Sequence, residues 1–167
     1  MRPLWALDID GVVAPVGENH CGDPHLHAST PASLGHAAEM WLCWDASIVT
    51  RVAELHRSSV VEVAWLTTWL NDAATHFAPA VGLPDFAAIP EVSSTQAWSK
   101  LAWLVEYQKR HPVRPLVWTD DHLSPARRRA ARRHLPGPLL LMQPVSAVGL
   151  THRHLDRIER FAAEVNG

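Results

Sequence analysis

The sequence predicts a single α/β domain: a Rossmann-like parallel sheet of about five strands with helices on both faces. Short apolar runs alternate with segments of helical periodicity, and this alternation is typical of a parallel sheet that is buried on both sides. Polar residues directly follow three of the apolar runs, as expected where strands end at a ligand site. The chain has 167 residues and is 47% hydrophobic, which is enough for one domain with its own core.

Charge and composition exclude several classes of protein. The formal net charge is −2, so the chain as a whole has no electrostatic attraction to nucleic acid or to an anionic membrane. No apolar run approaches the roughly 18 residues of a membrane span, and the first residues lack a signal-peptide pattern. Cys21 and Cys43 form no CxxC pair, which indicates a reducing compartment and no disulfide framework. We therefore expect a cytoplasmic domain without a membrane segment.

The stretch 4–13 contains the first candidate site. Leu4–Leu7 is apolar and too short for a helix, so it predicts a core strand. Asp8 and Asp10 follow it, and Gly11 lets the backbone turn away because glycine tolerates positive φ. Two carboxylates at the mouth of a buried strand are unfavourable without a cation, and Mg²⁺ prefers clustered oxygen ligands. A simple turn is the alternative interpretation of these residues taken alone.

Residues 14–44 form a long irregular stretch rich in Pro, Gly, His and Ser. Loops of this length are usually functional, so the stretch predicts a flap or lid that contacts substrate, with a short strand at Glu39–Trp44. It contains four possible zinc ligands whose spacing matches no standard zinc site, and a solvated lid is the preferred interpretation. These four are His20, Cys21, His25 and His27.

Apolar periodicity and capping residues predict the remaining elements. Further strands are expected at four apolar runs, which are 60–66, 87–90, 116–118 and 139–142. Helices are expected where a capping residue precedes an apolar stripe, at 48–56, from 71 or 72 to about 79, at 96–110, from 125 onwards and after Thr151.

Three polar pairs each follow a predicted strand. They are Asp8 with Asp10, Thr67 with Thr68, and Asp120 with Asp121. The carboxyl ends of parallel strands meet at one edge of the sheet, so the pairs are expected to converge on a single crevice. Any one pair also fits an ordinary strand end or a solvated turn. The prediction of a site therefore depends on their convergence.

These residues, in this order, resemble the four motifs of the haloacid dehalogenase-like (HAD) superfamily. The motifs are Asp8-Ile-Asp10-Gly-Val, Thr67 at a strand end, Lys100 on a helix, and Asp120-Asp121 after an apolar strand. The surroundings of Thr67 also resemble a group of small, poorly characterised bacterial HAD-domain proteins over nearly the whole chain. The resemblance implies a HAD fold with a minimal cap, with residues 1–167 as one domain and 14–44 as its flap.

The resemblance further implies a Mg²⁺-dependent phosphomonoesterase that acts on a small phosphorylated substrate. Asp8 would be the nucleophile that forms an aspartyl-phosphate, and Asp10 the general acid and base. Thr67, Thr68 and Lys100 would bind the phosphoryl group. The implied metal ligands are Asp8, Asp10, Asp120 and Asp121. Lys100 is preferred to Lys109 because Lys109 lies at a predicted helix end, only 11 residues before Asp120.

Because of the arginine-rich segment 127–133, two alternative functions remain open. A solvated helix face is its ordinary interpretation, but it also suits an anionic substrate or nucleic acid. One alternative function is therefore an end-processing phosphatase for nucleic acid. The other is a non-catalytic or regulatory binding module on a HAD scaffold. Trp69, just after the threonine pair, is expected near the pocket.

Overall fold

The computed structural model describes residues 1–17, 28–33, 39–93 and 98–167. Its centre is a parallel sheet with the strand order β4-β1-β5-β6. These strands are β1 (Leu4–Leu7), β4 (Glu62–Trp65), β5 (Leu116–Thr119) and β6 (Leu139–Met142). In the register of the sheet, Leu7 lies between Trp65 and Thr119, so the strands end at one edge. The predicted α/β fold class is confirmed.

The main sheet has four strands because the segment predicted as a strand at 87–90 makes only a short contact. Ala88 forms a single bridge with Trp65, supported by two backbone hydrogen bonds. Pro90 follows directly and has no N–H group to continue the ladder. The segment is therefore a short piece at the edge of β4 and does not form a fifth strand.

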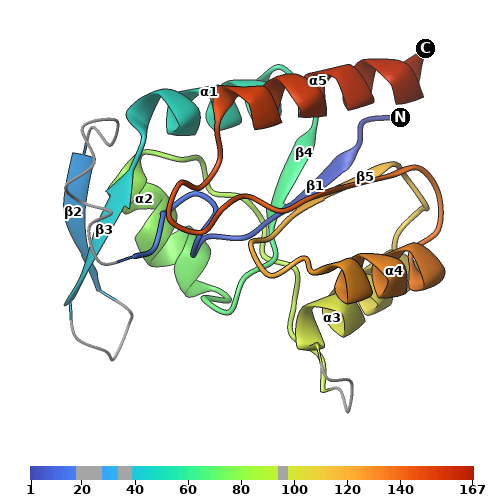
Figure 1. Cartoon of the computed structure of the whole chain (residues 1–167), viewed down its shortest axis with the longest axis horizontal. Coiled ribbons are helices and arrows are strands. Elements are labelled where there is room, and N and C mark those ends of the chain that lie inside the picture. Colours follow the sequence, from blue (N-terminus) through green and yellow to red (C-terminus); the bar gives the residue numbers. More distant parts are fainter. Residues whose placement is uncertain (18–27, 34–38, 94–97) are drawn as a thin grey trace.

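Helices cover both faces of the sheet (Figure 1). On one face α1 (Ala46–Arg57) lies beside α5 (His152–Asn166), and the other face is covered by α3 (Ser99–Lys109) and α4 (Pro125–His134). Alternate side chains of β1 enter two separate cores, Trp5 and Leu7 on the first face and Leu4 and Ala6 on the second. This alternation follows from the two-residue period of a strand and explains why β1 is apolar throughout.

Most helices begin at the predicted capping residues. The Asp45 carboxylate accepts hydrogen bonds from the N–H groups of Ser47 and Ile48, and Ser124 accepts one from the N–H of Arg127. Thr151 forms a capping box with His154 at the start of α5. The helix predicted over 96–110 is observed from Ser99 onwards, and residues 94–97 lie outside the described part of the chain.

The helix predicted after Asp72 has a different geometry from the expected one. It is a π-helix (Ala73–Phe77) that continues into the short α2 (Ala78–Val81). Pro79 has no N–H group for a regular α-helical ladder, which gives a physical reason for the wider turn before it. Gly82 ends the segment with φ of 81°, as a left-handed cap does.

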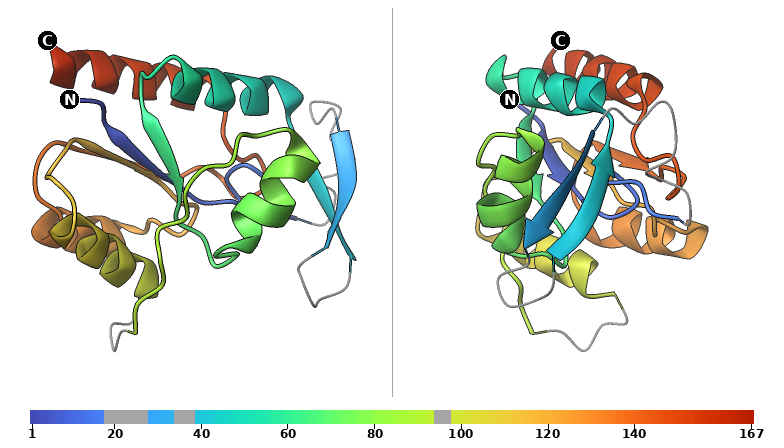
Figure 2. Two further views of the ribbon diagram at one scale, coloured as in Figure 1. Left: turned by 180° about the vertical axis from the view of Figure 1, so that it is seen from behind. Right: turned by 90° about the vertical axis from the view of Figure 1, so that its left-hand side faces the viewer.

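Part of the predicted flap is a β-hairpin. β2 (Ala28–Ser33) pairs antiparallel with β3 (Glu39–Trp44), which confirms the strand expected at 39–44. Figure 2 shows the hairpin beside α2, at one end of the sheet. The His- and Cys-rich residues 20–27 lie outside the described residues.

Cys43 is buried and disulfide-bonded. The expectation of no disulfide framework is therefore wrong, because the spacing of cysteines in the sequence does not show which sulfur atoms meet in the fold.

The amino ends of the strands are joined by a charge cluster around Glu62. Its carboxylate lies 2.8 Å from the Arg2 guanidinium and 2.6 Å from that of Arg114. Hydrogen bonding to Arg114, with a smaller contribution from Arg2, lowers the pKa of Glu62 to about 2. The cluster therefore ties the segments before β1 and β5 to β4.

None of the helices in the described part of the chain has the length and apolar character of a membrane span.

Candidate active site

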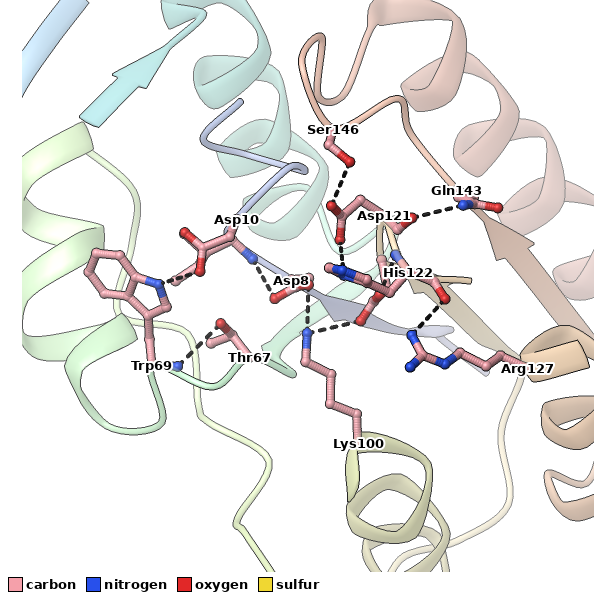
Figure 3. Close-up of polar contacts among 12 residues, drawn as sticks. Asp8, Asp10, Thr67, Trp69, Lys100, Asp121, His122, Arg127, Gln143 and Ser146 are labelled. Atoms are coloured by element: carbon pink, nitrogen blue, oxygen red, sulfur yellow. Dashed lines mark hydrogen bonds and ion pairs between the residues drawn. The ribbon is translucent and has the colours of Figure 1, made fainter. Parts of the chain in front are cut away.

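Asp8 directly follows β1, and its carboxylate faces Lys100 of α3 at the carboxyl edge of the sheet (Figure 3). The Lys100 Nζ atom lies 2.6 Å from Asp8 Oδ2 and 2.9 Å from Asp120 Oδ2. These side chains are 10%, 5% and 0% exposed, respectively. The backbone N–H of Ile9 donates a hydrogen bond to Asp8 Oδ1. Because an isolated buried charge is strongly unfavourable, the ammonium between two carboxylates is what permits this burial.

Burial and the neighbouring charges have opposing effects on the pKa values of both Asp8 and Lys100. Burial raises the pKa of Asp8 to about 7; the Lys100 ammonium opposes this rise, and the Asp120 carboxylate adds to it. Burial lowers the pKa of Lys100, but the charges and hydrogen bonds of Asp8 and Asp120 outweigh it, so this pKa is raised. Lys100 is therefore a fixed positive charge beside Asp8.

Asp10 lies on the turn after β1 and is oriented by an indole. The Trp69 Nε1–H donates a hydrogen bond to Asp10 Oδ2 at 2.9 Å, and the Trp69 backbone N–H donates to Thr67 Oγ1 at 3.3 Å. The Trp69 ring packs edge-on against Phe77 of the π-helix. The expectation that Trp69 lies near the pocket is met, and the structure adds its role of holding the Asp10 carboxylate.

Asp121 packs against the same turn. Gly11 has φ of +67°, and a Cβ atom there would lie 2.3 Å from Asp121 Oδ2, so both its conformation and its surroundings require glycine. Ser146 donates a hydrogen bond to Asp121 Oδ2 at 2.7 Å, and the Gln143 amide donates one to the Asp121 carbonyl. The orientation of this carboxylate is thus fixed by several groups.

The residues present suit a divalent metal ion. Asp121 Oδ1 is buried and lacks a hydrogen-bond partner among the described residues, although His122 Nδ1 lies 2.6 Å away. Asp120, Asp121 and His122 offer ligand atoms that lie within 4.8 Å of one another. Among the described residues that line the cavity, four are aspartates, and only Lys100 and Arg127 carry permanent positive charge. A hard cation with oxygen ligands would balance this excess negative charge.

A cavity of about 230 Å³ joins these groups. Asp8, Asp10, Lys100, Asp120 and Asp121 all line it, so the structure brings the predicted carboxylates and lysine together. The two threonines differ: Thr68 is exposed and lines the cavity, whereas Thr67 is buried beneath it with its hydroxyl bonded to Trp69.

Two features elsewhere do not compete with this site. Lys109, the other lysine, is 66% exposed and pairs with Glu106 at 3.2 Å. A larger cavity of about 550 Å³ lies near the carboxyl ends of α3 and α4, but no carboxylate is among the described residues that line it. The acidic cavity is therefore the candidate active site.

Sequence reasoning missed one wall of the site. Trp98 stacks on Trp118 with ring centroids 4.5 Å apart, and the Arg127 guanidinium carbon lies 4.7 Å from the Trp98 ring centroid. Arg127 also donates a hydrogen bond to the His122 carbonyl at 3.0 Å. Two signals pointed towards this wall: the arginine-rich segment 127–133, which suits an anionic substrate, and Ser124-Pro125, which fixes the start of α4 and with it the position of Arg127.

The parallel sheet and the Asp8–Lys100–Asp120 cluster at its carboxyl edge define a HAD-like hydrolase domain. A family model described as the HAD domain in Swiss Army Knife RNA repair proteins matches residues 6–155. The chain belongs to this family, which confirms the suspected superfamily. A search of curated proteins finds no match.

Proposed function

We propose that this domain is a Mg²⁺-dependent phosphomonoesterase that works through an aspartyl-phosphate at Asp8, with residues 1–167 as one domain. The observation that carries the proposal is the placement of Asp8 against a buried lysine, in a cavity that four aspartates line. A nucleophile, a fixed positive charge and an oxygen-rich metal site are the groups that phosphoryl transfer requires.

The proposed reaction has two steps, formation of the aspartyl-phosphate and its hydrolysis. First, an Asp8 oxygen forms a bond to phosphorus while the bond to the leaving oxygen breaks, and Asp10 gives that oxygen a proton. Then a water molecule attacks phosphorus, Asp10 accepts a proton from it, and the bond to Asp8 breaks. The products are an alcohol and inorganic phosphate. The Trp69 indole holds the Asp10 carboxyl group in place for both proton transfers.

The remaining groups bind the phosphoryl oxygens and the metal. Lys100 and the exposed Thr68 hydroxyl would contact these oxygens, and Thr67 supports the turn through its bond to Trp69. Asp8, Asp120 and Asp121 would hold Mg²⁺ through their carboxylates, and Asp10 through its backbone carbonyl. The ion, when bound, offsets the negative charge of the phosphate and of the nucleophile.

The test is hydrolysis of an aryl phosphate with and without Mg²⁺ by wild type, Asp8→Asn and Lys100→Ala, with Lys109→Ala as the matched control. We expect metal-dependent turnover that is lost in Asp8→Asn and Lys100→Ala and kept in Lys109→Ala. If the folded wild type binds Mg²⁺ but turns over no phosphate monoester, the alternative of a non-catalytic binding module is favoured.

A second candidate, the phosphorylated end of an RNA strand as substrate, is favoured by two observations. The matching family model is described by RNA repair proteins, and the basic helix α4 begins at the active-site cavity. Binding of RNA to Asp8→Asn should then weaken steeply as salt is raised. Absent or salt-insensitive binding would favour a small phosphorylated molecule as substrate.

A further inference from the structure

We propose that Arg127 is a specificity-determining residue that binds a second phosphate of the substrate, on the leaving group beside the phosphate that is hydrolysed. This proposal rests on the phosphomonoesterase function proposed above. Two sources share this chemistry: the first phosphodiester of an RNA strand with a phosphorylated end, and the second phosphate of a nucleoside bisphosphate.

Arg127 lies apart from the proton-transfer side of the site. It lines the same cavity as Asp8 and Lys100, from the first turn of α4. In Figure 3 the Arg127 guanidinium lies on one side of the Asp8–Lys100 pair, and Asp10 with Trp69 lies on the other. Because the leaving oxygen must come within hydrogen-bond reach of Asp10, the group that meets Arg127 lies further along the leaving group, away from that oxygen.

The Arg127 guanidinium is held in place by an aromatic ring and a backbone carbonyl group. One face lies over the Trp98 ring, which is itself stacked on the fully buried Trp118. One terminal nitrogen donates to the His122 carbonyl at 3.0 Å. In the described part of the chain Arg127 forms no ion pair with a carboxylate, unlike Lys100. A guanidinium has five N–H donors, so a fork remains for a ligand, and its preorganisation reduces the entropy lost on binding.

Phosphate is the group that best fits this fork. A guanidinium forms paired, charge-assisted hydrogen bonds with phosphate, which are about twice as strong as neutral ones. Beyond the cavity, α4 carries three more exposed arginines, Arg129, Arg132 and Arg133. A polyanionic strand that leaves the cavity past Arg127 would remain close to positive charge. The acidic pocket thus has a basic exit on the α4 side.

The experiment compares three substrates that differ in their second phosphate: an aryl phosphate, a nucleoside 3′,5′-bisphosphate and a short RNA with a terminal phosphate. The proteins are wild type, Arg127→Ala, Arg127→Lys and the control Arg157→Ala, an exposed arginine of α5 on the other face of the sheet. For Arg127→Ala we expect kcat/KM to fall about 10- to 100-fold on a substrate with a second phosphate, mainly through KM. On the aryl phosphate we expect a change of less than about twofold, and Arg157→Ala should stay within that limit on all three substrates. Arg127→Lys should be intermediate, because it keeps the charge but not the fork.

Each other outcome has a defined meaning. An equal loss on all three substrates would place Arg127 on the reacting phosphate and overturn the proposal, as would no loss on any. A loss on the bisphosphate alone assigns the second phosphate to a free nucleotide, and a loss on RNA alone assigns it to a strand. If Arg127→Ala fails to fold in a thermal unfolding assay, Arg127→Lys and Arg127→Gln carry the comparison.

A binding measurement separates this proposal from the proposed catalysis. The dissociation constants of the bisphosphate and the RNA are measured with Asp8→Asn, alone and combined with Arg127→Ala. Weaker binding of either in the double variant supports the second-phosphate contact even if wild type hydrolyses nothing, in which case only the catalytic proposal fails. Unchanged binding of both ligands overturns the role of Arg127, whatever the turnover.

Discussion

One glycine sets how closely the turn after β1 approaches Asp121. We predict that Gly11→Ala destabilises the protein more than Gly82→Ala does. Both glycines have positive φ, which costs alanine about 1–2 kcal/mol, but only at Gly11 would the new Cβ atom meet a carboxylate oxygen at 2.3 Å; at Gly82 nothing lies within 4 Å. Urea unfolding of the two variants measures the difference. Equal losses of stability would show that the close approach to Asp121 does not constrain the turn.

The buried Asp8 makes the stability of the metal-free protein depend on pH. The pKa of Asp8 is about 7 in the folded protein, against about 3.9 in an unfolded chain. Between these values the folded state keeps a proton that the unfolded state loses, so stability should fall as pH rises from about 4 to 7. Asp8→Asn cannot ionise, so we predict a smaller fall. Thermal unfolding at several pH values in a chelator measures both slopes, and identical slopes would contradict this role of Asp8.

The charged residues of the site were easier to predict than the residues that orient them. Asp8 and Asp120 end apolar strands, and a parallel sheet brings such ends together, so their proximity follows from local patterns. The Trp69–Asp10 hydrogen bond joins residues 59 positions apart, and the Trp98–Arg127 contact joins the residue before α3 to α4. No periodicity reports such contacts, because they depend on how side chains pack in three dimensions.

At the scale of elements, the loop between β4 and the π-helix positions the proposed general acid. We predict that Trp69→Phe lowers kcat about tenfold, because it removes the indole N–H that holds Asp10 but keeps an aromatic ring against Phe77. Trp103→Phe is the matched control, since it removes an indole hydrogen bond to the Val92 carbonyl outside the cavity lining. Steady-state kinetics and thermal unfolding of both variants separate the effects. A similar loss of activity in the two would mean that the bond to Asp10 has no special role.

Elements with strong local signals were predicted well, and the exceptions have physical causes. Ser124-Pro125 and Asp45 fix helix starts through hydrogen bonds within a few residues, which the sequence shows directly. The π-helix before Pro79 and the loss of a full strand at 87–90 depend on missing proline N–H groups within otherwise ordinary patterns. The hairpin partner of Glu39–Trp44 lay inside an irregular stretch with little strand pattern.

At the scale of the whole molecule, metal binding should be visible as stability. We predict that Mg²⁺ raises the free energy of unfolding by about 2–3 kcal/mol when present at 100 times its dissociation constant. The increase should be smaller in Asp121→Asn, which removes the charge of a carboxylate in the acidic cavity, and unchanged in Asp156→Asn on the surface of α5. Denaturant unfolding with Mg²⁺ and with chelator measures the increase. No stabilisation of wild type at any Mg²⁺ concentration would contradict a metal site at these carboxylates.

The two ends of the sheet respond differently to pH, because Glu62 lies at one pole and Asp8 at the opposite pole. The ion pairs with Arg2 and Arg114 hold the pKa of Glu62 at about 2, below its ordinary value of 4.5, so their stabilisation is complete above 4.5 and is lost only as pH falls through 2. At the opposite pole the protonated Asp8 contributes its full stability at about pH 4, and that contribution is lost as pH rises towards 7. As pH falls towards 2, amide hydrogen exchange should therefore begin at the amino ends of the strands while their carboxyl ends stay closed. Acid unfolding of this domain would then have a direction, starting at the edge that holds Glu62.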